Sequence, residues 1–163
     1  MKYSALTVAA LLVAPSLSLP KISSPGQIIL TNNMNRPIRL DKRVRPIRLD
    51  KRADESIILH QGQTIQLAAS EKSLDLKLSE QNAQHSQVEV GYTSNDQGTY
   101  GFNIKPVEGG GFPGKIEVIP FTARPSPQCF SLVWKPGQES TKQSTCEDHT
   151  SLRVFLLEVP LPA

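Results

Sequence analysis

Four carboxylates in the second half of the sequence are the residues that could carry out acid–base chemistry. They are Glu89, Asp96, Glu108 and Glu117. Hydrolysis of a glycosidic bond needs two carboxyl groups at a defined separation, one of them with a raised pKa. All four residues alternate with apolar neighbours or lie in expected turns, which is typical of side chains that face solvent. We therefore expect a protein that is not an enzyme, and keep a weak glycoside hydrolase as an alternative.

Other catalytic and cofactor motifs are missing from the sequence. The three histidines have no His-x-x-x-His spacing, and no Gly-x-Ser-x-Gly elbow of an α/β-hydrolase occurs. The glycines at 109–111 are not followed by the Gly-Lys-Ser/Thr of a phosphate-binding loop, so they predict a plain turn. We expect neither a metal nor a cofactor.

The first eighteen residues have the pattern of a secretory signal peptide. A short positive start is followed by a small and apolar run over 5–13 and by small residues up to Ser18. We expect cleavage after Ser18, a linker over 19–26 and one domain over 27–163. No later segment has the ~18 apolar residues of a transmembrane helix, so the sequence predicts a secreted, extracellular protein.

Secretion determines how the only two cysteines, Cys129 and Cys146, are interpreted. In an oxidising compartment they most simply form one disulfide. Its loop encloses sixteen residues, and closing a loop of that size stabilises a fold by roughly 3 kcal/mol. A catalytic thiol would need a histidine partner, and a zinc site would need two further ligands.

A basic octapeptide occurs twice. The sequence Arg-Pro-Ile-Arg-Leu-Asp-Lys-Arg begins at Arg36 and, after Val44, begins again at Arg45. In one hypothesis the chain is a precursor, cleaved by a kexin-type protease after Lys42–Arg43 and Lys51–Arg52, which releases a short basic peptide. In the other, the duplicated segment 36–52 is an exposed hairpin, because Pro-Ile-Arg-Leu alternates as a strand does and Asp-Lys-Arg favours a turn. Both hypotheses remain open at this point.

Charge separates this segment from the rest of the chain. Residues 36–52 hold eight basic and two acidic residues, a net of +6, whereas 53–163 hold eight basic and thirteen acidic, a net of −5. Because the body is acidic, we expect no nucleic-acid partner and no membrane partner.

Short apolar runs bounded by Gly, Pro, Asn and Ser predict an all-β fold, an antiparallel β-sandwich in a single domain with one disulfide. The pattern predicts a hairpin around Gln61-Gly62-Gln63 and another around 94–97. Nine or ten strands are expected. Nine cover 27–31, 55–60, 64–68, 73–79, 87–93, 98–104, 116–119, 130–134 and 152–159, and the hairpin hypothesis adds 37–40.

Three aromatic residues, Tyr92, Tyr100 and Trp134, are candidates for binding. A sugar-binding face needs two or three rings exposed in a row. The alternative is that they pack in the core, as large aromatic residues usually do.

Two stretches carry a resemblance to known families. Gln-Ile-Ile-Leu-Thr-Asn-Asn at 27–33, followed by a short strand, resembles the N-terminal strand pair of thaumatin-like proteins. The stretch 88–120 and the two cysteines after it resemble the second half of small secreted fungal proteins of the yeast-phase-specific (Blastomyces-type) family. In place of that family's Tyr-Tyr-Asp-Leu-Ser pattern, this chain has Tyr-Gly-Phe-Asn-Ile.

The resemblance implies a secreted, non-enzymatic interaction protein of fungal type, an effector or a cell-wall-associated binding module. Its partner would be a host protein or a cell-wall polysaccharide, and the protein itself a monomer. Because some thaumatin-like proteins act weakly on β-glucans, the resemblance also implies that the alternative hydrolase would be a β-glucan hydrolase.

Overall fold

The structure is a computed structural model that describes residues 26–44, 55–68, 73–83, 87–95, 98–107, 111–121, 126–147 and 150–159. Within these residues there are eleven strands and no helix. They are β1 (Gln27–Asn32), β2 (Ile38–Val44), β3 (Glu55–Leu59), β4 (Thr64–Ala68), β5 (Ser73–Glu80), β6 (Gln87–Ser94), β7 (Thr99–Pro106), β8 (Gly114–Phe121), β9 (Leu132–Trp134), β10 (Ser144–Glu147) and β11 (Ser151–Glu158).

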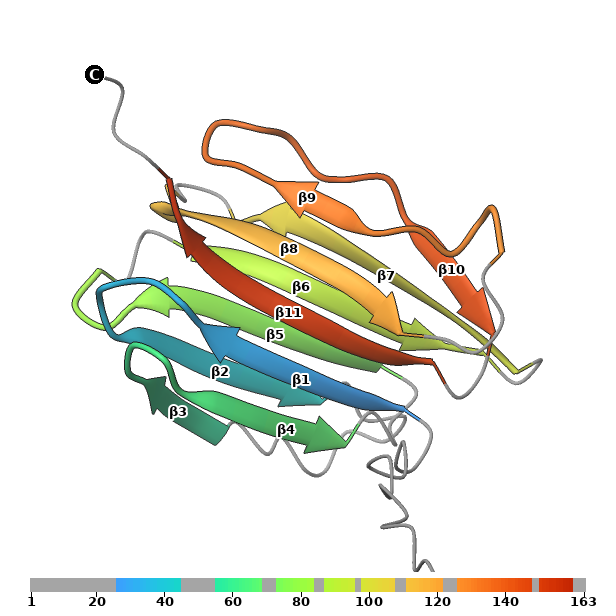
Figure 1. Ribbon diagram of the computed structural model, residues 1–163, viewed down its shortest axis with the longest axis horizontal. Coiled ribbons are helices and arrows are strands. Elements are labelled where there is room, and N and C mark those ends of the chain that lie inside the picture. Colours follow the sequence, from blue (N-terminus) through green and yellow to red (C-terminus); the bar gives the residue numbers. More distant parts are fainter. Residues whose placement is uncertain are drawn as a thin grey trace, which may run out of the picture.

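The strands form two sheets that pack face to face, which confirms the predicted β-sandwich (Figure 1). The five-stranded sheet has the order β4-β1-β11-β8-β9, and the six-stranded sheet has the order β10-β7-β6-β5-β2-β3. Alternate residues of each strand point into the space between the sheets, as the period of two requires. The inward side chains, among them Leu30, Leu40, Val118 and Val154, are fully buried and form one core.

One strand pair departs from the predicted antiparallel arrangement. β1 runs parallel to β11, with Ile29 opposite Arg153, whereas the other pairs between the described strands are antiparallel. The two strands stand near opposite ends of the sequence, so no tight turn joins them. A parallel pair is possible only where the connection is long, and the sequence pattern of a single strand does not report its neighbour's direction.

The hairpin predicted around Gln61-Gly62-Gln63 is wrong. The turn does join β3 to β4, but β3 belongs to the six-stranded sheet and β4 to the five-stranded sheet. Gly62 has a positive φ of 76°, which is a conformation that glycine adopts without strain. The turn therefore carries the chain from one sheet to the other.

Asn32 at the end of β1 forms the hydrogen bonds that fix the turn between β3 and β4 and the crossing from β1 to β2. Its side chain is completely buried, accepts a hydrogen bond from the Met34 amide, and donates to the carbonyls of Arg36 and Leu59. Its own carbonyl accepts from the Gly62 amide. Because β1 and β2 also lie in different sheets, Asn32 joins the two places where the chain crosses the sandwich.

Most other predicted elements are confirmed. The hairpin around 94–97 joins β6 to β7, with Val90 opposite Ile104 and Tyr92 opposite Phe102. The prediction missed β10, whose sequence Ser-Thr-Cys-Glu has no apolar alternation apart from the cysteine. The predicted signal peptide and most of the predicted linker lie outside the described residues, so both remain predictions. In the part of the chain that the structure describes, no helix is long and apolar enough to cross a membrane.

Candidate interaction surface

The outer face of the five-stranded sheet carries apolar side chains in register across neighbouring strands. One row runs Val133, Glu117, Phe155, Thr31 and Thr64 across all five strands of the sheet. A second row runs Ile119, Arg153, Ile29 and Gln66 across β8, β11, β1 and β4. On β8, β11 and β1 the residues that alternate with these rows, such as Ile116, Val118, Val154 and Leu30, are fully buried, so the rows point away from the core. We call the surface made by Ile29, Glu117, Ile119, Phe121, Val133, Arg153 and Phe155 the apolar face.

The large apolar side chains that are exposed gather on or beside this sheet. Among the described residues they are Ile119 (37% exposed) and Phe121 (40%) on β8, Val133 (47%) on β9, Phe130 just before β9, and Val159 just after β11. Single exposed apolar residues are ordinary on protein surfaces, but a gathered set marks an interaction site. The expectations drawn from the sequence do not include this surface. Part of the surface is indicated by the strand at 114–121, because its outward positions include the apolar residues Ile119 and Phe121.

A cation lies over one of these rings. The Cζ atom of Arg153 is 5.0 Å from the centroid of the Phe121 ring, which is within the range of a cation–π interaction. On the same face of β8, Lys115 Nζ lies 2.7 Å from Glu117 Oε1. The apolar face therefore combines aliphatic and aromatic side chains with a few charges.

Two of the hollows on this side of the molecule include residues of the apolar face. A shallow one of about 250 Å³ is lined by Ile29, Thr31, Arg153 and Phe155 on the apolar face. A larger one of about 510 Å³ lies at the free edge of β9 and is lined by Phe130, Leu132, Val133 and residues 138–142. Because Val133 belongs to both the face and the edge hollow, the two regions are continuous.

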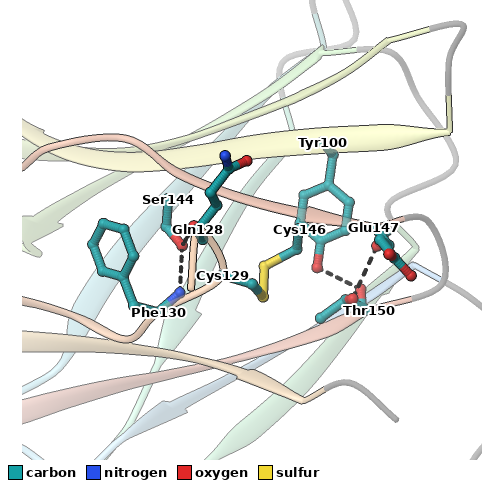
Figure 2. The surroundings of a disulfide bond; sticks show 8 residues. All are labelled: Tyr100, Gln128, Cys129, Phe130, Ser144, Cys146, Glu147 and Thr150. Atoms are coloured by element: carbon teal, nitrogen blue, oxygen red, sulfur yellow. Dashed lines mark hydrogen bonds between the residues drawn. A yellow bond between two sulfur atoms is a disulfide. The ribbon is translucent and has the colours of Figure 1, made fainter. Parts of the chain in front are cut away.

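The disulfide fixes the segment that carries Phe130. Cys129 and Cys146 are bonded, with their Cα atoms 4.7 Å apart, which confirms the predicted pair. Figure 2 shows Ser144 beside the bond: its hydroxyl accepts a hydrogen bond from the Phe130 amide at 2.9 Å and donates to the Gln128 carbonyl at 3.3 Å. The disulfide and these hydrogen bonds connect the segment before β9 to β10, so the backbone that carries the exposed Phe130 ring is held in place.

The outer face of the six-stranded sheet is different in character. Asp41, Lys77, Glu89 and Lys105 stand side by side on β2, β5, β6 and β7, so that opposite charges alternate. Lys105 Nζ lies 2.7 Å from Glu89 Oε1, and Glu89 is only 6% exposed. Opposite charges on adjacent strands stabilise a sheet, which is a sufficient explanation for this row.

The three aromatic candidates for binding lie in the core. Trp134, Tyr100 and Tyr92 are 1%, 2% and 3% exposed. The Tyr100 hydroxyl donates to the Thr150 carbonyl at 2.8 Å, and Trp134 Nε1 donates to the Gln138 carbonyl at 3.1 Å (Tyr100 and Thr150 in Figure 2). A ring that stacks on a sugar must be exposed, so in this structure these three form no sugar-binding face, and the core-packing alternative agrees with their positions.

The structure places the two described candidate carboxylates, Glu89 and Glu117, far apart. Glu89 faces outward from β6 in the six-stranded sheet, and Glu117 faces outward from β8 in the five-stranded sheet. The whole sandwich lies between them, so they cannot act on one glycosidic bond. Asp96 and Glu108 lie outside the described residues. No group of three or more histidine, cysteine, aspartate or glutamate side chains that could hold a metal occurs in the described ranges.

The first candidate processing site lies inside a sheet. Lys42 and Arg43 belong to β2, where Lys42 pairs with Glu55 of β3 and with Leu76 of β5, and Arg43 pairs with Asp75. Residues 38–43 of the first copy thus lie in a strand, and the turn that the hairpin hypothesis expects at Asp-Lys-Arg is not found at 41–43. Lys51 and Arg52 lie outside the described residues, and cleavage at either pair stays a prediction.

Comparison with known proteins places the fold. The structure is similar to the crystal structure of the protein elicitor MoHrip2 from Magnaporthe oryzae, with a TM-score of 0.61, 16% sequence identity and coverage of 81% of this chain and 98% of that one. It is also similar to the thaumatin-like xylanase inhibitor TLXI, with a TM-score of 0.55, 12% identity and coverage of 79% and 97%. The chain thus has a thaumatin-like β-sandwich fold. No family model and no curated protein matches the sequence, so the resemblance to the yeast-phase-specific family has no support from the sequence comparisons.

Proposed function

We propose that this protein is an extracellular, non-enzymatic interaction protein that binds another protein through the apolar face. The observation that carries the proposal is the gathering of Ile119, Phe121 and Val133 on one sheet, 37–47% exposed, next to the Phe130 edge. Protein interfaces combine aromatic and aliphatic anchors with arginine at their centre, and Arg153 lies over Phe121 within this face.

A protein partner fits this surface better than a polysaccharide does. Sugar-binding faces use two or three exposed aromatic rings in a row, and the three aromatic candidates are buried. Of the rings on the apolar face, Phe121 has the Arg153 guanidinium over it. The apolar face also presents branched aliphatic side chains, Ile29, Ile119 and Val133, on the three strands β1, β8 and β9. Such side chains bind by excluding water from a complementary apolar surface.

Two observations support an extracellular role. The Cys129–Cys146 disulfide is typical of proteins from oxidising compartments, and residues 1–18 have the pattern of a signal peptide. The two similar structures are named as a protein elicitor and as a xylanase inhibitor. An effector of fungal type fits this combination.

The experiment compares capture by immobilised wild-type protein with capture by Ile119→Asp and Val133→Asp variants, from extracellular fluid of leaf tissue. Lys77→Gln, on the opposite face, is the matched control. The proposal predicts proteins that bind the wild type and the control but not the two variants. Equal capture by all four would overturn it, and binding of the wild type to purified xylan or β-glucan would identify a polysaccharide partner instead.

A further inference from the structure

The position of β2 in the six-stranded sheet is filled by the first copy of the octapeptide. β2 lies between β3 and β5 and pairs with both over residues 38–42. Ile38 and Leu40 point into the core and are completely buried. Just before the strand, Arg36 donates to Glu80 at 2.5 Å and lies 3.5 Å from Glu158, and this hydrogen bond to Glu80 raises the pKa of Arg36.

The second copy offers the same side chains in the same order. Each residue of 45–52 repeats its counterpart in 36–43, nine positions later. Ile47 and Leu49 match the buried Ile38 and Leu40, and Arg45 matches the arginine that pairs with Glu80. The Asn32 side chain bonds a backbone carbonyl at position 36, and any residue in that place supplies a carbonyl. Every contact described above can therefore be made by either copy.

The lengths of the two connections trade places when the copies are exchanged. In this structure three residues separate Asn32 from Arg36, and twelve separate Lys42 from its partner Glu55. With the second copy in the sheet, twelve residues would separate Asn32 from Arg45, and three would separate Lys51 from Glu55. Loop-closure entropy depends on the logarithm of each length, so its sum is the same in both arrangements. Three-residue loops are also common in hairpins.

We infer that the β2 position accepts either copy of the octapeptide, so that the chain has two alternative registers with the same sandwich. The register described here is favoured by Met34, which is buried in the core two residues before Arg36 and packs against Gly114. In the other register Met34 would have to stay buried in the core although it would lie near the start of the twelve-residue connection between Asn32 and Arg45.

The exchange bears on the two Lys-Arg pairs. In the first register Lys42–Arg43 is part of a sheet, and in the second Lys51–Arg52 takes that position. A protease that cuts extended chain outside the sheet would therefore cut at Lys51–Arg52 in the first register and at Lys42–Arg43 in the second. In the first register a single cut after Arg52 leaves β1 and β2 on one fragment, paired with strands of both sheets. In the second register a single cut after Arg43 leaves β1 on one fragment and the second copy on the other. Either cut would give two chains in one sandwich and release no peptide.

The test uses the full-length mature chain with Ile38→Asp and Leu40→Asp together, which bars the first copy from the core. The matched variant carries Ile47→Asp and Leu49→Asp, and a control carries all four changes. These substitutions also give the two copies different masses, so hydrogen exchange measured by mass spectrometry can separate them. We expect both double variants to fold cooperatively, while the fourfold variant does not fold.

Exchange then reports the register. In the variant changed at 38 and 40, amides of 47–51 should be protected and those of 38–42 should exchange quickly. The variant changed at 47 and 49 should show the reverse. The inference is overturned if the variant changed at 38 and 40 does not fold, if it folds without protection over 47–51, or if the fourfold variant folds.

Discussion

The guanidinium of Arg153 on β11 lies over the ring of Phe121 on β8, with Cζ 5.0 Å from the ring centroid. Both side chains stand on the apolar face, where the ring is 40% exposed. A double-mutant cycle of Arg153→Gln and Phe121→Leu should give a coupling of about 0.5–1 kcal/mol in the free energy of unfolding, the range for exposed cation–π pairs. Urea unfolding of the four proteins measures it. A coupling of zero would show that the stacked arrangement is not held in solution.

Asn32 should be among the most sensitive polar positions in the protein. Asn32→Ala leaves the Met34 amide and the carbonyls of Arg36 and Leu59 without their partner, and a buried unpaired group costs about 1–3 kcal/mol. We expect a loss of at least about 2 kcal/mol in the free energy of unfolding. The exposed neighbour Asn33 is the matched control, and Asn33→Ala should change it by less than about 0.5 kcal/mol. Similar losses for both variants would contradict the role given to Asn32.

Removal of the disulfide should weaken the fold without changing its topology. Replacing Cys129 and Cys146 by alanine opens a loop whose ends are separated by 17 positions, and loops of this size are worth about 3 kcal/mol. Thermal unfolding with and without reductant gives the same comparison on the wild type. A double variant as stable as the oxidised wild type would show that β10 and the segment before β9 are held by their hydrogen bonds alone.

Deletion of residues 44–52, which removes one copy of the octapeptide, should leave a folded and slightly more stable protein. The connection between Lys42 and Glu55 shortens from twelve residues to three, and two halvings of loop length stabilise by about 1 kcal/mol. Urea unfolding measures the gain. Failure of the deletion variant to fold would contradict the register in which Lys42 pairs with Glu55.

Sequence patterns predicted the strands well because each strand carries its own evidence in its side-chain alternation. The segment 73–79 alternates leucine with polar residues, and it is β5 almost to the residue. Cys129 and Cys146 were paired because no other cysteine exists. These features depend on residues close together in the chain or on the absence of competitors.

The failures concern relations between strands. The turn at Gln61-Gly62-Gln63 has the residues of a hairpin, but its direction is set by Asn32, almost thirty residues earlier. The extent of the apolar face could not be predicted either, because Val133, Phe155 and Ile29 come onto one face only through the order of strands in the sheet. The aromatic candidates illustrate the same limit, since Tyr92 and Tyr100 alternate in the same way whether their side of the sheet is buried or exposed.

The central claim, that the apolar face is the docking surface for a protein, is tested most directly by site-specific photo-crosslinking. A photoreactive amino acid replaces Val133 on the apolar face in one variant and Lys77 on the opposite face in another, and each is illuminated in extracellular fluid of leaf tissue. The account predicts discrete protein adducts from position 133 and none from position 77. Adducts from position 77 alone, or the same adducts from both positions, would contradict it.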